Sequence, residues 1–290
     1  MGLAVGDALG TTLEFQPPGS FAPITDMTGG GPFNLQPGQW TDDTAMALCL
    51  ATSLVERGGF DPYDQMQRYV RWYRQGYLSS TGQCFDIGNT VRAALERFER
   101  SGEPMAGSDD PYTAGNGGLM RLAPVAMAWA LQAPETSHFA AEATRTTHAA
   151  EEALDASRLF ATQLRHALNG EDKHIILVGH RARVSAPAIV EIAKGDVASW
   201  EQQGIVGSGY VVDSLRAALW CFATTDDFAS AVLKAANLGD DADTTAAICG
   251  QLAGAYYGVQ AIREDWRNAI VMADTINQLS DQLYQAALLG

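Results

Sequence analysis

Apolar residues recur along most of the chain at the three- and four-residue spacing of one helical face. After Asp61 and Pro62, apolar side chains occupy positions 66, 69, 70 and 73. Aspartate followed by proline is typical of a helix start, and the spacing is that of an amphipathic helix. The same spacing follows Asn89, at positions 91, 94, 95 and 98. We expect further helices over residues 43–57, 118–131, 137–148, 151–168, 186–194, 212–222, 226–237, 244–258 and 274–289.

Evidence for strands is restricted to one short apolar run at residues 175–178, which fits a helix or a strand equally well. The chain is therefore predicted to be all-α. No linker and no repeat divides it, so we expect a single domain over residues 1–290. Residues 15–39 are the least regular region and contain a run of three glycines. A connection of that length in a compact domain is usually functional.

The charge balance narrows the classes of partner. Asp and Glu number 34 against 19 Lys and Arg, which gives a net charge of −15. This excess weighs against nucleic-acid and membrane partners, because phosphate binding relies on clustered basic residues. The four cysteines form no CxxC pair, and we expect buried thiols in a cytoplasmic protein. The uncharged run at 244–262 contains regularly spaced glycines and polar residues, which favours a packed core helix over a membrane span.

Two short acidic clusters stand at predicted helix starts, Thr41-Asp42-Asp43-Thr44 and Asp240-Asp241-Ala242-Asp243-Thr244. Either cluster alone is explained by helix capping, because Asp and Thr accept hydrogen bonds from the free amides of the first turn. Carboxylates and hydroxyls are also the ligands that Mg²⁺ and Mn²⁺ prefer. Two matched clusters in one acidic chain favour a pair of bound metal ions.

Two glycine-rich turns lead into predicted helices, Gly88-Asn89-Thr90 and Gly115-Asn116-Gly117-Gly118. A glycine turn that opens a helix presents free amides and a positive dipole end, which suits phosphate. Most such turns only reverse the chain, so each is a weak signal by itself.

Taken together, these segments resemble the ADP-ribosylglycohydrolase family, and within it the dinitrogenase-reductase-activating branch that removes ADP-ribose from arginine. The matching segments run in the family's order over residues 2–10 with Glu14, 38–44, 86–90, 115–118, 239–245 and 254–258. The resemblance implies a compact, single-domain orthogonal helical bundle. Family members usually have a longer segment before the first motif, so we expect the opening helix to be short.

The resemblance also implies two Mg²⁺ or Mn²⁺ ions. Their ligands would be Thr41, Asp42, Asp43, Asp241, Asp243 and Thr244. Asp240 stands where many relatives have glycine and is left out of this set.

The catalytic carboxylates implied by the resemblance are Glu14, beside the metals, and Asp86, which acts on the ribose. The substrate-binding residues would be Gly88, Asn89, Thr90, Gly115, Asn116, Gly117, Gly118, His148 and Tyr210. For His148 and Tyr210 an alternative stays open, since His148 could cap a helix end and Tyr210 could be a core residue. Asp86 could likewise only cap the helix that starts near Asn89.

The implied activity is hydrolysis of the N-glycosidic bond of ADP-ribosylated protein arginine, with ADP-ribose as product, by a monomeric enzyme. An alternative is a hydrolase for serine-linked, O-acetyl or nucleic-acid-linked ADP-ribose. A non-catalytic, crystallin-like relative is another, because a shared scaffold does not ensure turnover. Two other helical metal enzymes fit less well: no histidine is followed by aspartate, as a His-Asp phosphohydrolase requires, and the aspartate spacing of isoprenoid synthases is absent.

Overall fold

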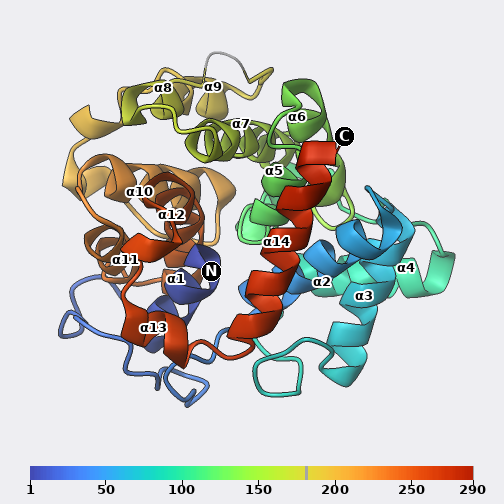
Figure 1. The fold of residues 1–290 in the computed structure, drawn as a ribbon, viewed down its shortest axis with the longest axis horizontal. Helices are drawn as coiled ribbons and strands as arrows, with labels where there is room; N and C mark the ends of the chain where they lie inside the picture. The colour runs from blue at the N-terminus through green and yellow to red at the C-terminus, as the bar shows by residue number, and fades with distance from the viewer. Residues whose placement is uncertain (180–181, 290) are drawn as a thin grey trace.

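The computed structural model is built from helices joined by loops (Figure 1). It describes residues 1–179 and 182–289, and within these ranges no strand is present, only three isolated bridges. The helices are α1 (Gly2–Gly10), α2 (Asp42–Arg57), α3 (Pro62–Gln75), α4 (Asn89–Ser101), α5 (Ala123–Ala128), α6 (Ala133–Arg145), α7 (Glu151–Leu168), α8 (Lys173–Leu177), α9 (Pro187–Ile192), α10 (Val211–Ala223), α11 (Phe228–Ala236), α12 (Ala242–Tyr257), α13 (Glu264–Ala269) and α14 (Ala273–Leu289). The all-α prediction is confirmed.

The first helix lies in the middle of the molecule, against α12 (Figure 1). Glycine makes this close approach possible. A Cβ atom added to Gly6 would lie 2.1 Å from the carbonyl oxygen of Ala246, and one added to Gly10 would lie 2.3 Å from that of Ala242. The two helices therefore meet backbone to backbone, which fixes the start of α12 relative to the segment that follows α1.

Local sequence signals set the ends of α3 as predicted. The Asp61 side chain accepts hydrogen bonds from the amides of Tyr63 and Asp64, and Pro62 is the first helical residue. The helix ends at Gly76, whose φ of 68° is left-handed. An aspartate cap, a proline start and a glycine end together specify this helix from its own residues.

Two of the predicted helices differ from the structure. Residues 118–131 do not form one helix: a 3₁₀ turn over Asn116–Gly118 precedes the short helix α5. Pro124 lies in the first turn of α5 and has no amide hydrogen to extend a helix from the residues before it. The helix predicted over 137–148 is α6, which begins four residues earlier, with Pro134 in its first turn, and ends at Arg145. His148 therefore lies in the loop after α6.

The remaining uncertain segments are helical. The run at 175–178 lies mostly in α8 rather than in a strand. The glycine-containing run at 244–262 begins in α12, where Gly250 packs against the carbonyl oxygen of Gly2. Among the described helices, none combines the length and the apolar character that crossing a membrane requires. The four cysteines are unpaired, and Cys84 is half-buried while the other three are buried.

Candidate metal centre and its cavity

One cavity of about 740 Å³ brings together most of the residues singled out in the sequence. The lining comes mainly from Glu14 and Phe15 after α1, from the starts of α2 and α12, and from the two glycine turns. The lining residues are Glu14, Phe15, Asp42, Asp86, Ile87, Gly88, Asn89, Thr90, Val91, Gly115, Asn116, Gly117, Met120, His148, Ser208, Gly209, Asp240, Asp241, Asp243 and Thr244. The lining residues that were not predicted as site residues are Phe15, Ile87, Val91, Met120, Ser208, Gly209 and Asp240.

The two acidic clusters meet at the cavity although they are 200 residues apart. The Thr41 hydroxyl lies 3.0 Å from a carboxylate oxygen of Asp243, and the Thr244 hydroxyl lies 3.3 Å from one of Asp43. Each cluster thus contributes a threonine that faces an aspartate of the other. Neither helix start has a side-chain cap of the expected kind at its N-cap residue. The capping interpretation therefore does not account for these residues.

Asp7, which was not predicted as a site residue, anchors the first cluster. One of its carboxylate oxygens accepts from the amide and the hydroxyl of Thr41, both at 2.9 Å. The other accepts from the amide and the hydroxyl of Thr44, at 3.0 and 2.6 Å. The signal was present in the sequence, because Asp7 is the only charged residue in the apolar segment Gly2–Gly10. A buried carboxylate requires such partners.

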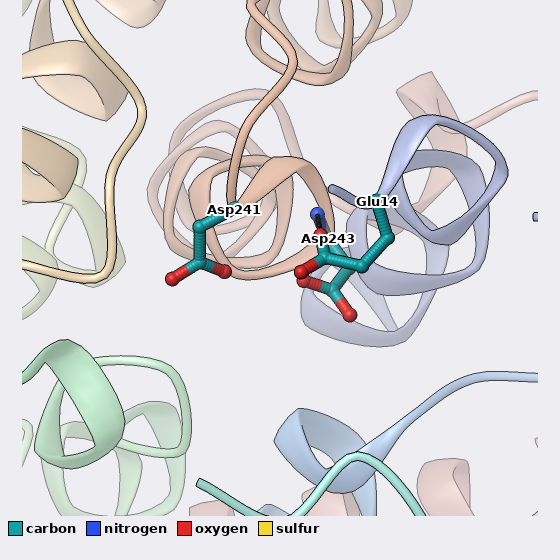
Figure 2. A group of neighbouring side chains, drawn as sticks. All are labelled: Glu14, Asp241 and Asp243. Atoms are coloured by element: carbon teal, nitrogen blue, oxygen red, sulfur yellow. Dashed lines mark hydrogen bonds between the residues drawn. The ribbon is translucent and has the colours of Figure 1, made fainter. Parts of the chain in front are cut away.

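Glu14 performs a similar task for the second cluster. Its Oε2 atom accepts from the amides of Ala242, at 2.8 Å, and Asp243, at 3.3 Å. Carboxylate oxygens of Glu14, Asp241 and Asp243 all lie within 4.8 Å of one another. Figure 2 shows the three side chains gathered at the start of α12 and directed to the same side. This spacing is short enough for the three groups to share one metal ion.

Burial and mutual repulsion raise the pKa values of the carboxylates of the centre. Burial, and then the charge of Asp241, raise the pKa of Glu14 to about 8. Burial is also the largest cause of the pKa values of Asp42, Asp43 and Asp243 lying well above their usual range. The Oδ1 atom of Asp43 is buried and has no hydrogen-bond partner. Crowded acidic groups and an unpartnered oxygen fit a hard divalent cation, which would supply the missing partner.

Asp86 lines the same cavity as the acidic centre. Its φ of 58° is left-handed, a conformation that is strained for a residue with a side chain. The helix that follows, α4, has Gly88 as its N-cap and no side-chain cap. The alternative in which Asp86 only caps that helix is therefore wrong. Burial, and to a smaller extent the charge of Asp241, raise the pKa of Asp86 to about 6 although a hydrogen bond with Asp243 lowers it.

The glycine turns form the opposite wall with His148. The side-chain amide of Asn116 donates to Asp241 at 2.8 Å, which connects the second turn to the acidic centre. A Cβ atom on Gly117 would lie 2.6 Å from Cε1 of His148, so only glycine fits there beside the ring. Burial, followed by the charge of Arg121, lowers the pKa of His148 to about 3. His148 does not cap a helix end, since it lies beyond α6 and faces the cavity.

Tyr210 is 39% exposed, so the alternative that makes it a core residue is wrong. Its hydroxyl donates to a carboxylate oxygen of Glu152 at 2.6 Å. The backbone of Tyr210 pairs with that of Gly115 in an isolated β-bridge. Tyr210 is not one of the residues that line the cavity, although Ser208 and Gly209 are. Among the other predicted site residues, Thr41, Asp43 and Gly118 lie behind the lining.

The fold and this cavity define an all-helical protein with a candidate centre for hard divalent cations and a cleft lined by acidic residues and glycine turns. The chain belongs to the ADP-ribosylglycohydrolase family, whose model matches residues 1–289. The predicted family resemblance is confirmed.

Individual relatives cover nearly the whole chain. An ADP-ribosylarginine hydrolase, Tri1, of Pseudomonas putida (strain GB-1) is 45% identical over 287 residues, which is 99% of this chain and 77% of that protein. The ADP-ribosyl-[dinitrogen reductase] glycohydrolase of Rhodospirillum rubrum is 34% identical and covers 94% of this chain and 88% of its own length. A solved structure described as an ADP-ribosylglycohydrolase-related protein complex has a TM-score of 0.88 and 45% identity, with 99% of this chain and 95% of that chain covered.

Proposed function

We propose that this chain hydrolyses the N-glycosidic bond between ADP-ribose and a protein arginine, in a reaction that depends on divalent metal ions. The observation that carries the proposal is the reciprocal pairing of the two acidic helix starts at the wall of a cavity that the glycine turns also line. The arginine linkage is supported by the relatives, two of which are named for hydrolysis of ADP-ribosylarginine.

Two Mg²⁺ or Mn²⁺ ions would be held by hydroxyl and carboxylate oxygens of both clusters. The proposed ligands are Thr41, Asp42, Asp43, Asp241, Asp243 and Thr244. When bound, such ions supply Lewis-acid chemistry and neutralise the carboxylates. The unpartnered Oδ1 atom of Asp43 supports this part of the proposal.

Glu14 and Asp86 are the proposed acid–base pair. Cleavage of a glycosidic bond passes through an oxocarbenium-like state, so the leaving guanidine must gain a proton while water loses one. Without metal ions, burial raises the pKa of Glu14 to about 8, and this carboxyl group is the proposed proton donor. Asp86, with a pKa of about 6, ionises more readily and is suited to act at the ribose.

The glycine turns would hold the ribose and pyrophosphate, with His148 beside them and Tyr210 at the edge. Free amides at the starts of α4 and of the 3₁₀ turn at Asn116–Gly118 support this assignment. The continuous hydrophobic core supports a single domain over residues 1–290. We further propose a monomeric, cytoplasmic enzyme with an ADP-ribosylated protein as its partner.

The test is release of ADP-ribose from a model ADP-ribosylated arginine in the presence of Mg²⁺ or Mn²⁺, with serine-linked and O-acetyl ADP-ribose as parallel substrates. Activity on the arginine conjugate supports the proposal. Turnover of only another linkage would retain the family and overturn the arginine assignment. A folded protein that binds metal ions and turns over none of the three would contradict the catalytic role.

A further inference from the structure

A fully buried arginine lies behind the glycine turns. Arg121 is 1% exposed, and its guanidinium lies 4.8 Å from the centroid of the Tyr69 ring. Its shortest hydrogen bond, 2.6 Å, goes to the hydroxyl oxygen of Thr147. Its other acceptors are more distant: the Ala143 carbonyl at 3.5 Å and the Met46 sulfur at 3.7 Å. The contact with Thr147 is therefore the principal polar contact of this cation.

Thr147 connects this arginine to His148. Its hydroxyl oxygen lies 2.9 Å from Nδ1 of the imidazole. Arginine has donors and no acceptor, so the guanidinium N–H must donate to the Thr147 oxygen. The single hydroxyl hydrogen then has one acceptor among the described contacts, Nδ1 of His148. In the other arrangement Nδ1–H would donate to Thr147, and a buried hydroxyl hydrogen would be left without an acceptor, which is costly.

We infer that Arg121 and Thr147 are positioning residues that hold His148 as the neutral tautomer with its proton on Nε2, so that the ring presents a donor to the anionic part of the substrate. The inference rests on the proposed function for the identity of that ligand. The direction of the donor follows from the two hydrogen bonds alone.

The Nε2 side of the ring is the side that a ligand can reach. His148 is 2% exposed and lines the cavity. Among the described residues, no side chain or backbone group accepts a hydrogen bond from Nε2. Cβ atoms added to Gly115 and Gly117 would each lie 3.2 Å from Nε2, so any other residue at these positions would crowd this nitrogen. A buried donor without a protein partner is costly unless a ligand or water accepts from it. Pyrophosphate and ribose oxygens are such acceptors.

The direct test is a ¹⁵N NMR spectrum of the imidazole nitrogens at neutral pH in the whole protein. The His148 signals are assigned by their loss in His148→Gln, since the chain has five histidines. We expect Nε2 to have the shift of a protonated nitrogen and Nδ1 that of an unprotonated one. A proton on Nδ1, or a charged ring, would overturn the inference whatever the protein hydrolyses.

The second test uses Thr147→Val, which has nearly the same shape and lacks the hydroxyl. We expect its affinity for ADP-ribose, measured by calorimetry, to fall about tenfold, in line with one hydrogen bond to a charged group. The ¹⁵N spectrum should show mixed tautomers, while Mn²⁺ affinity stays unchanged. Thr147→Ser should restore both readouts.

The matched control is Thr146→Val, since Thr146 is an equally buried neighbour whose hydroxyl donates to Ala143 and does not touch His148. If both valine variants lose the same affinity, the effect is structural and the inference fails. If Thr147→Val does not fold, the spectra of the unmodified protein and of Thr147→Ser decide the question. Absence of ADP-ribose binding in the unmodified protein would contradict the proposed function and leave the tautomer measurement valid.

Discussion

The two acidic helix starts have similar motifs, but different carboxylates hold them. At the start of α2, both oxygens of Asp7 are occupied by amides and hydroxyls of Thr41 and Thr44. At the start of α12, both bonds of Glu14 end on Oε2. The hydrogen bonds that Asp7 accepts all hold the start of α2 in place, whereas Glu14 also lines the cavity. On the proposed function, Asp7 is therefore a positioning group and Glu14 is the carboxyl group that takes part in the reaction.

The largest expected effect comes from removing one carboxylate charge at the start of α2 or at the start of α12. Asp43→Asn and Asp243→Asn should each abolish metal binding and ADP-ribose release, because both clusters are proposed to share the same ions. The helical fold should survive, since losing one buried charge relieves repulsion. Calorimetry with Mn²⁺, circular dichroism and the release assay check this. If one variant retains full Mn²⁺ affinity, the two starts do not form one centre.

Substitution of Asp86 tests whether the acid–base groups are confined to the start of α12. Asp86→Ala should lower kcat by about 100-fold, in the range of lost acid–base assistance, with little change in Mn²⁺ affinity. The measurements are kcat, metal affinity and Tm on the same protein. Because no cap bond from Asp86 is present, loss of stability is not expected to explain the result. A fully active variant would end the catalytic assignment.

The variant Asp7→Asn tests the carboxylate that holds the start of α2 in place. An amide offers one oxygen where the carboxylate offers two, so the amide hydrogen of Thr41 or Thr44 would then face a donor. Loss of a group that orients a metal ligand should weaken Mn²⁺ binding about tenfold.

The matched control is Asp155→Asn. Asp155 is a buried carboxylate that accepts from the amides of Ser185 and Ala186 and lies on a different helix, α7. The Asp155→Asn variant should retain the Mn²⁺ affinity of the unmodified protein, whatever stability it loses. Equal Mn²⁺ affinity in the two variants would show that Asp7 has no special part in the centre.

The sequence predicted the helices whose own residues specify their ends, such as α3 with Asp61 and Gly76. It did not predict the division of 118–131, because the periodic apolar positions continue through the proline that interrupts the helix. The acidic clusters and the glycine turns were recognised by motif, and the structure brings them together at one cavity. The lone charge of Asp7 in an apolar segment was visible in the sequence, but its bonding partners were not. They and the bonds of Arg121 and Thr147 depend on which distant amides and hydroxyls meet a side chain after folding.

The smallest expected effect is on the thermal stability of the metal-free protein. Its pH dependence distinguishes the buried carboxylates of the centre from carboxylates in ordinary ion pairs. Burial raises the pKa of Asp7 and of Asp86 to about 6, and that of Glu14 to about 8. A group whose pKa is raised by folding binds more protons in the folded state than in the unfolded one. Stability from such a group is present below its unfolded value, near pH 4, and is lost as the pH rises through the folded value.

The metal-free protein should therefore melt at a lower temperature at pH 8 than at pH 5, by on the order of 5 °C. Paired carboxylates act in the opposite sense: hydrogen bonds from Ala186 and Ser185 and the bond to Arg158 hold the pKa of Asp155 below its usual value despite its burial. Saturation with Mg²⁺ or Mn²⁺ should remove most of the decrease, because a cation at the centre stabilises the ionised carboxylates that protons no longer neutralise. Melting curves at both pH values, with and without metal ions, measure the effect. A metal-free Tm that rises from pH 5 to pH 8 would mean that the paired carboxylates outweigh the carboxylates of the centre.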